Sequence, residues 1–176
     1  QAQTVSGGGI SIAGQAPLGG QDLSPDSGSV TTNRNLIKGN LAGVGDGGGI
    51  HVARVNGEDL AADPNTTEHR ESGAIVHSMI VNNVAAGAGG GISIQESARV
   101  QIINNTVAHN DSTATASVAF DPSNPNESNP QPAGVVARAH SAALAAAVAG
   151  ADVPRLSVGY ANPQLQNNII EENRSF

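Results

Sequence analysis

Gly89-Gly90-Gly91-Ile92-Ser93-Ile94 is the stretch that decides the fold, because the same pattern occurs three times in the chain. The earlier copies are Gly7-Gly8-Gly9-Ile10-Ser11-Ile12 and Gly47-Gly48-Gly49-Ile50-His51-Val52, which makes the spacings 40 and 42 residues. In each copy apolar residues flank a polar one, the period-two alternation of a strand with one buried face. Glycine permits positive φ and a close approach of neighbouring backbones. We therefore predict glycine turns before stacked strands, formed by Gly47, Gly48, Gly49, Gly89, Gly90 and Gly91.

A second unit of six residues has a polar residue first, a β-branched residue third and Asn last. Its four copies cover residues 35–40, 78–83, 105–110 and 168–173. Asn tolerates the left-handed backbone region at a tight turn, and equivalent side chains of stacked coils lie about 4.8 Å apart. The pattern predicts a structural ladder of Asn40, Asn83, Asn110 and Asn173. It also predicts an aliphatic column in the core, formed by Ile37, Ile80, Val107 and Ile170.

The composition indicates a thin core of small side chains. The 176 residues include two Phe, one Tyr and no Trp, so Val, Ile, Leu and Ala must fill the interior. Such a core suits stacked coils, in which each layer buries its apolar face against the next. We predict an all-β, right-handed parallel β-helix, a solenoid of five or six coils that occupies residues 1–176 as a single domain with long loop insertions.

Three insertions interrupt the predicted coils, at about residues 15–28, 54–72 and 111–162. Within the third, we expect a strand over 116–120, an irregular loop over 121–132 and a degenerate glycine-strand motif over 133–138. One short helix is predicted near 141–150, because Ser141 can cap it while Leu144 and Val148 share a face. We expect His51 and His109 to face solvent.

The glycine-strand motif and the Asn-ended unit together resemble the right-handed parallel β-helix superfamily. The chain is most similar in kind to autotransporter passenger domains, polymorphic outer-membrane proteins and other bacterial cell-surface proteins of that fold. The resemblance implies a secreted or cell-surface location and a segment of a larger protein. It leaves the function open, because the superfamily includes adhesins and scaffolds as well as pectate lyases and polygalacturonases.

The net charge of −7 and the lack of a basic cluster argue against nucleic acid as a partner. Without cysteine, the chain has no disulfide and no thiolate chemistry. No apolar run approaches the roughly 20 residues that a membrane span needs, so we expect no direct membrane insertion. No cofactor is predicted.

Only loop residues offer candidate chemistry. Asp63, Glu68, His69, Arg70 and Glu71 form a local charged cluster that could line a groove. Asp22 and Asp26 are weak calcium candidates, since Asp22, Ser24 and Asp26 are spaced two apart as in an oxygen-rich loop. The ordinary interpretation of both sets is a solvated loop, and the pattern predicts no catalytic residue.

Two functions follow from these observations. The first is a non-enzymatic extracellular scaffold for adhesion, assembly or protein–protein contact. The alternative is a fragment of a carbohydrate-active enzyme, a lyase or hydrolase with a polysaccharide in its groove; paired carboxylates beside that groove would favour it. We expect other coils of the parent protein, or a partner chain, to cover the open solenoid ends.

Overall fold

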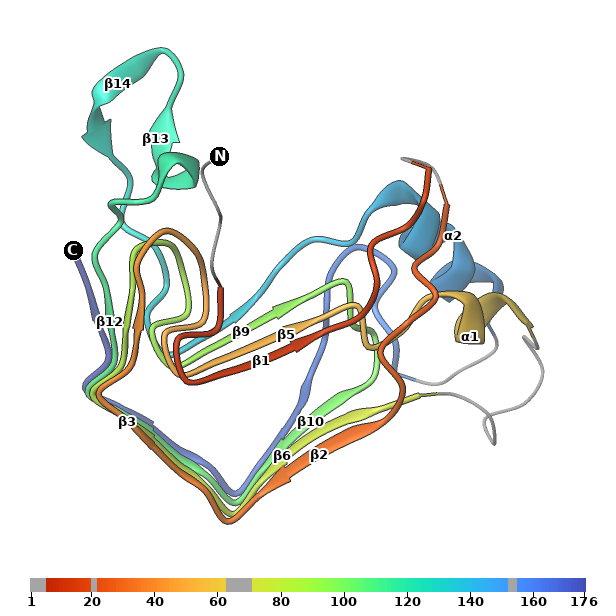
Figure 1. The fold of residues 1–176 in the computed structure, drawn as a ribbon, viewed down its shortest axis with the longest axis horizontal. Coiled ribbons are helices and arrows are strands. Elements are labelled where there is room, and N and C mark those ends of the chain that lie inside the picture. The colour runs from red at the N-terminus through yellow and green to blue at the C-terminus, as the bar shows by residue number, and fades with distance from the viewer. Residues whose placement is uncertain (1–5, 20–21, 63–70, 152–154) are drawn as a thin grey trace.

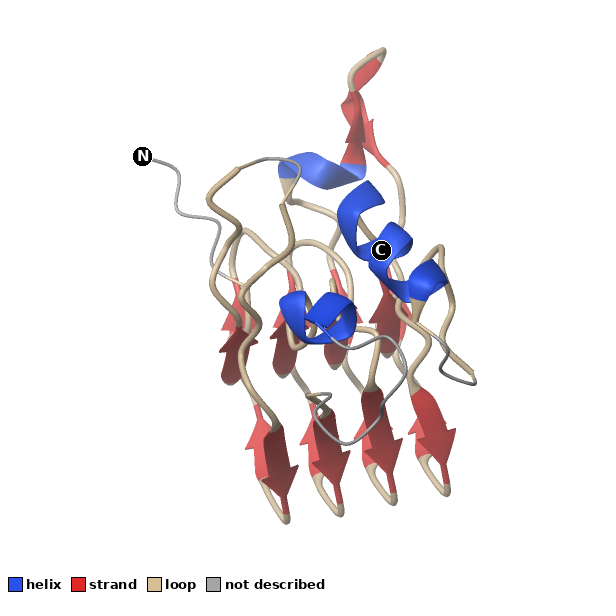
Figure 2. Cartoon of the chain, turned by 90° about the vertical axis from the view of Figure 1, so that its right-hand side faces the viewer, coloured by secondary structure: helices blue, strands red, loops and turns tan. Residues whose placement is uncertain are grey.

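The computed structural model describes residues 6–19, 22–62, 71–151 and 155–176. Strands predominate, and they form four parallel sheets of four strands each and one antiparallel pair. The chain passes through the four parallel sheets in the same order four times, as the colours in Figure 1 show. We call these passes layers 1 to 4. Figure 2 shows the strands of successive layers lying side by side. The prediction of a mainly β structure with repeated parallel strands is confirmed.

Each sheet takes one strand from every layer. Sheet A consists of β1 (Ile10–Ala13), β5 (Ile50–Ala53), β9 (Ile92–Gln95) and β15 (Val135–Ala137). Sheet B consists of β2 (Val30–Asn33), β6 (Gly73–Val76), β10 (Val100–Ile103) and β16 (Gln164–Gln166). Sheet C consists of β3 (Leu36–Lys38), β7 (Met79–Val81), β11 (Thr106–Ala108) and β17 (Ile169–Glu171). Sheet D consists of β4 (Leu41–Ala42), β8 (Val84–Ala85), β12 (Asp111–Ser112) and β18 (Arg174–Ser175).

The core is a set of aliphatic columns that run from layer to layer. Ile37 pairs with Ile80, Ile80 with Val107, and Val107 with Ile170, which is the column that the sequence predicts. Ile50, Ile80, Ile92 and Val107 have no exposed surface, because layers lie on both sides of them. Each buried side chain of this size contributes about 1.5–3 kcal/mol. Small β-branched residues therefore suffice where aromatic residues are scarce.

The second and third glycine triplets, residues 47–49 and 89–91, lie where the chain turns from sheet D into sheet A. Gly47 and Gly89 have φ of 70° and 65°, a conformation that side chains with a Cβ rarely adopt. At the next position, a Cβ on Gly48 or Gly90 would overlap a carbonyl of the adjacent sheet D strand. The triplet is therefore needed at this turn for two reasons, backbone conformation and space.

Left-handed residues recur at the two corners that flank sheet C. Each lies directly before the first or last position of the six-residue unit and has φ between 50° and 70°. The corner residues are Arg34, His77, Asn104 and Asn167 before sheet C, and Gly39, Asn82, His109 and Glu172 after it. A non-glycine residue in this region costs about 1–2 kcal/mol, so these corners need compensating bonds.

The long connections leave the layers mainly at one corner, between sheets A and B. They cover residues 14–29, 54–72 and 138–163, and only layer 3 has a short connection, 96–99. Helices α1 (Glu58–Ala62) and α2 (Ala142–Gly150) belong to these insertions and lie on the right in Figure 1. A second apolar cluster joins them, containing Leu60, Ala98, Leu144 and Val148. The insertions thus pack together over the short layer 3 connection.

The predicted helix is confirmed as α2. It begins at Ala142, one residue after the predicted start, because Ser141 is its N-cap and the Ser141 Oγ accepts a hydrogen bond from the Leu144 N–H at 3.3 Å. Leu144 and Val148 are its buried residues, as predicted. No helix within the described ranges has the length and apolar character that a membrane crossing requires.

The region 111–162 differs from the prediction in three ways. Strands β12 and β15 lie inside it, so the insertion is two segments, 113–134 and 138–163. A 3-10 helix, η1 (Ser117–Ala119), replaces most of the predicted strand. The predicted irregular loop contains an antiparallel hairpin of β13 (Phe120–Asp121) and β14 (Asn124–Ser128), which projects from the layers in Figure 2. The Asp121 carboxylate accepts bonds from Ser123 N–H and Oγ–H and closes the turn.

The described residues form four layers, where the sequence led us to expect five or six coils. The four six-residue units fall one to a layer, so the number of these units gives the number of layers. Layers 2 and 3 have just 27 residues between equivalent Asn positions, whereas layers 3 and 4 have 63.

Candidate functional site

Asparagine side chains form a ladder at the corner between sheets C and D. The Nδ2 groups of Asn40, Asn83 and Asn110 each donate to the Oδ1 of the next Asn at 2.9 Å, ending at Asn173. Each Oδ1 also accepts the backbone N–H of the preceding Asn at 3.0 Å. The structure thus brings the four predicted ladder residues together, and their role is to hold the corners in register.

A second ladder lies at the other end of sheet C, and we did not predict it. Its residues are Asn35, Ser78, Asn105 and Asn168, the first positions of the four six-residue units. The backbone N–H of Asn35 donates to Ser78 Oγ at 3.1 Å, and that of Ser78 to Asn105 Oδ1 at 2.9 Å. Asn105 bonds in the same way to Asn168. The polar first position in every copy was the available signal, but Ser78 breaks the Asn pattern.

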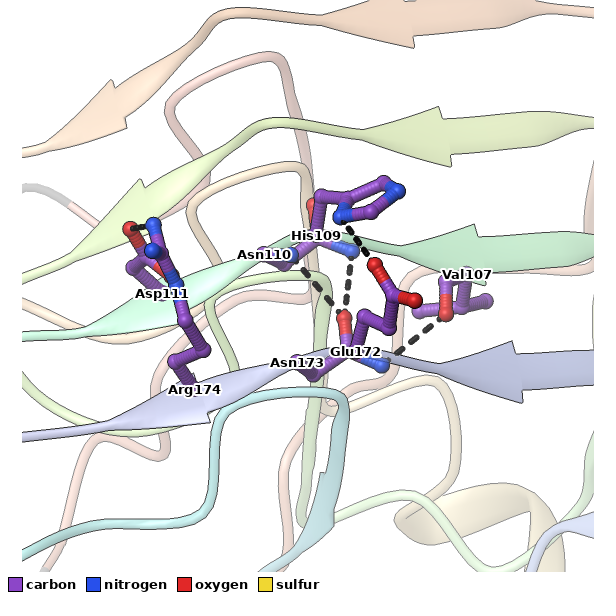
Figure 3. A network of polar contacts seen from close by, with 7 residues as sticks. All are labelled: Val107, His109, Asn110, Asp111, Glu172, Asn173 and Arg174. Atoms are coloured by element: carbon purple, nitrogen blue, oxygen red, sulfur yellow. Dashed lines mark hydrogen bonds and ion pairs between the residues drawn. The ribbon is translucent and has the colours of Figure 1, made fainter.

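Layers 3 and 4 are also joined by ion pairs on both sides of the Asn ladder (Figure 3). His109 Nδ1 lies 3.1 Å from a Glu172 carboxylate oxygen. Arg174 donates to both carboxylate oxygens of Asp111, at 2.8 and 2.7 Å, which raises the pKa of its guanidinium. Between these pairs, Asn173 Nδ2 donates to the Val107 carbonyl at 2.9 Å. His109 is exposed, as predicted.

The candidate binding site is a groove over the outer face of sheet A, which we call the sheet A groove. Two adjoining hollows of about 390 and 460 Å³ form it, and both are lined by Gln95 and Ala139. The insertions that carry Asp22, Asn56 and Ser141 form one wall. The opposite wall consists of residues 44–46 and η1. In Figure 1 this region lies above strands β1, β5 and β9, between the two groups of loops.

Most acids in the groove are already bonded within the chain. Asp46 Oδ2 accepts bonds from Arg138 Nε at 2.9 Å and Nη2 at 2.7 Å, and Asp46 Oδ1 accepts the Ala88 N–H. Glu96 accepts bonds from Ser141 N–H at 2.5 Å and Ser141 Oγ–H at 2.6 Å, at the start of α2. These carboxylates position loops, and they are not available as a catalytic pair.

Two histidines lie close to the groove, and burial lowers the pKa of both. His51 is in the outer row of sheet A, between Ser11 and Ser93 in the register. Burial lowers its pKa; Asp46 opposes this shift, and Arg54 and Arg138 add to it. For His140, burial lowers the pKa, and the charge of Glu96 opposes this shift. Both rings are therefore favoured in the neutral form.

The expectation that His51 faces solvent was wrong. The side chain points to the outer face of sheet A, but the residue is only 7% exposed. Its Nδ1 and the Oγ of the neighbouring Ser93 have no hydrogen-bond partner among the described residues. The sequence alternation correctly gives the face of the strand, but not the burial of His51, whose charged neighbours include Asp46 and Arg138 from distant parts of the chain.

The predicted charged cluster lies mostly outside the residues that the structure describes, namely at Asp63, Glu68, His69 and Arg70. Glu71 is described, and its carboxylate accepts a hydrogen bond from Ser29 Oγ–H. Its backbone N–H donates to Asp59 Oδ2 at 3.0 Å. Glu71 therefore ties the connections of layers 1 and 2 together.

The two calcium candidates lie in different settings. Asp22 lines the groove, whereas Asp26 Oδ1 accepts the Gly28 N–H at 2.9 Å in a turn. Burial raises the pKa of Asp26; the Gly28 bond opposes this, and Asp59 and Glu71 add to the rise. Across the described ranges, no three His, Asp or Glu side chains gather as a metal site would require.

Comparison with known proteins gives no family for the chain: no family model, no curated protein and no solved structure matches it.

Proposed function

We propose that this chain is a segment of a right-handed parallel β-helix that serves as a non-enzymatic scaffold and presents its insertions to partner proteins. The observation that carries the proposal is the arrangement of the connections 14–29, 54–72 and 138–163. They emerge at one corner and share the apolar cluster around Leu60 and Leu144. A surface assembled from several layers is typical of solenoids that bind proteins.

The hand of the solenoid follows from a general rule. Parallel strands joined by crossover connections are right-handed in about 98% of cases, because strand twist favours that hand. The repeated sheet order and the parallel pairing support a solenoid. The Asn ladders give it the rigidity that a scaffold needs, because each buried amide is bonded to the layers above and below.

The state of the groove acids favours a scaffold over an enzyme. Glycoside-cleaving enzymes need two available carboxyl groups about 5–10 Å apart. In the sheet A groove, Arg138 donates hydrogen bonds to the Asp46 carboxylate and Ser141 to the Glu96 carboxylate. Among the described residues that line the groove, Asp22 is the acid whose side chain makes no hydrogen bond. The outer rows of sheet A contribute Ser, His, Val, Ala and Gln side chains, but no carboxylate.

The proposal includes an extracellular or cell-surface location in a bacterium, which the resemblance to passenger domains supports. It also includes a cover for the outer side of layer 4, where Leu165 and Ile170 of the core columns are exposed. Further layers of a parent protein or a partner chain would remove this apolar surface from water.

The alternative is a polysaccharide-binding enzyme fragment, and the observation in its favour is the groove itself. The two hollows adjoin across the layers, and Asp22, Gln95 and Arg54 line them with groups that can bond sugar hydroxyls.

One pair of assays distinguishes the two functions. The chain is immobilised, and binding of bacterial or host cells is compared with a variant in which residues 138–163 are replaced by the short connection 96–99. The matched control shortens the hairpin 120–128, which lies on the other side of the groove. A scaffold loses binding in the first variant only. Depolymerisation of a uronate or neutral polysaccharide by the unmodified chain, abolished by Asp22→Asn, would overturn the scaffold function.

A further inference from the structure

The outer face of sheet C is an exposed apolar surface, and it is separate from the loops of the proposed function. One row of this face contains Leu36, Met79, Thr106 and Ile169, which pair in register from layer 1 to layer 4. Leu36, Met79 and Ile169 remain 66%, 51% and 54% exposed. Three of the four side chains in this row are thus large, apolar and exposed, and a patch of such side chains in water marks a contact surface.

The second row of the face has opposite charges at its two ends. It contains Lys38 in layer 1, Val81 and Ala108 in the middle, and Glu171 in layer 4. Three strand spacings, about 14 Å, separate the ammonium end from the carboxylate end, so Lys38 and Glu171 cannot pair within one chain. Neither makes an ion pair with another residue in the described ranges.

We propose that a second copy of this chain binds the outer face of sheet C, face to face and with its layer order reversed. A two-fold axis parallel to the strands then brings Lys38 of each copy to Glu171 of the other. The apolar row meets itself, with Leu36 against Ile169 and Met79 against Thr106. The isologous geometry satisfies both charges and covers the exposed side chains in one step.

The charges select this orientation over the one with parallel layer order. A two-fold axis along the layers would exchange the two rows, so that Lys38 would face Leu36 and Glu171 would face Ile169 of the second copy. Burial of a charge against an apolar side chain is unfavourable. In the reversed orientation the corner residues also avoid like charges, because Arg34 meets Asn167 and Glu172 meets Gly39.

The contact is expected to be weak. A face of four short strands is smaller than the roughly 800 Å² per partner of a standard stable interface. Dimers should therefore form at high protein concentration and dissociate on dilution. Because the ion pairs lie in water-accessible positions, added salt should weaken the association.

Sedimentation velocity over a concentration series tests the proposal with three variants of the full chain. Lys38→Glu and Glu171→Lys should each weaken self-association about tenfold, since an attraction at two symmetric contacts becomes a repulsion. The double variant should associate as the unmodified chain does. An equimolar mixture of the two single variants should also associate, because each supplies the charges that the other lacks.

The control is Glu127→Lys on the projecting hairpin, which changes the net charge as Glu171→Lys does and should leave association unchanged. Circular dichroism spectra of all variants check that the fold is retained. A monomer at every concentration would overturn the proposal. Single variants that associate as strongly as the unmodified chain would also overturn it. The same holds if neither the double variant nor the mixture recovers self-association. Loss of loop-dependent cell binding without loss of dimers would affect the proposed function alone.

Discussion

Asp46 and Arg138 form a clasp across the outer face of sheet A, although 92 residues separate them in the chain. Asp46 precedes the glycine turn into layer 2, and Arg138 follows the sheet A strand of layer 4. The pair is largely shielded, with side-chain exposures of 27% for Arg138 and 13% for Asp46. It therefore connects layers that do not pair with each other through backbone hydrogen bonds.

Loss of this clasp should destabilise the fold. Arg138→Met leaves the Asp46 carboxylate shielded without its cation, and we expect the free energy of unfolding to fall by about 1–3 kcal/mol. Urea denaturation followed by circular dichroism measures the change. The control is Arg174→Met, which removes the Asp111 pair at a more exposed site and should change stability little. Equal losses in the two variants would contradict the special role of the clasp.

Replacement of a buried Asn inside the ladder should lower the free energy of unfolding more than replacement of an exposed Asn. Asn83 has no exposed surface, and its Nδ2 donates to the Ile37 carbonyl and to Asn110 Oδ1. Asn83→Ala leaves buried groups of both neighbouring layers unpaired, so we expect a loss of about 2–4 kcal/mol. Asn126→Ala on the exposed hairpin is the matched control and should cost little. Comparable urea midpoints for the two variants would refute the ladder's contribution.

The close backbone approach at the glycine turns can be tested by adding the same methyl group at a crowded glycine and at an open one. In Gly90→Ala, the new Cβ would overlap the Asp111 carbonyl, and the backbone of either sheet must move. We expect a loss of about 1–3 kcal/mol. Gly43→Ala places a Cβ where no atom lies within 4 Å and should change stability by less than about 0.5 kcal/mol. Thermal unfolding of the two variants side by side measures the difference, and a tolerated Gly90→Ala would rule out the close approach.

Acid should weaken the fold through His51. Burial holds its pKa below the ordinary value of 6.5, so the unfolded chain binds a proton at a higher pH than the folded chain does. The contribution of the neutral ring to stability is fully present above the unfolded pKa and decreases as the pH falls below about 6.5. The urea midpoint should therefore fall between about pH 7.5 and pH 5.

His51→Gln should flatten this pH dependence, and adding His140→Gln should flatten it further, since burial shifts the pKa of His140 in the same direction. Asp26 has the opposite effect on the stability of the fold at lower pH. Its pKa in the folded chain is raised from 3.8, so protonation of its carboxylate favours the folded state. An unchanged pH profile in His51→Gln would show that this ring does not titrate on unfolding.

Patterns confined to a few residues predicted the parts of the fold that repeat. The alternation around Ile50 and Ile92 gave the strands of sheet A, and the capping residue Ser141 gave α2. The second ladder was missed because Ser78 replaces an amide with a hydroxyl that fills the same role. The register could therefore be predicted where the side-chain chemistry was identical in each layer.

Contacts between distant segments were beyond sequence analysis. Nothing local links Asp46 to Arg138, and nothing local indicates that His51 is buried, so His51 was expected to lie in water. The hairpin strand β14 contains Pro125, which lacks an N–H donor and argued for a loop. It is accommodated because this strand has a partner on one side only.

The register of the layers can be checked through side-chain amide contacts measured by nuclear Overhauser spectroscopy. This register predicts contacts between the Nδ2 protons of Asn83 and Asn110 and between those of Asn110 and Asn173, across sequence separations of 27 and 63 residues. Contacts of Asn83 or Asn110 with any other set of asparagines, or none between these pairs in the folded chain, would contradict it.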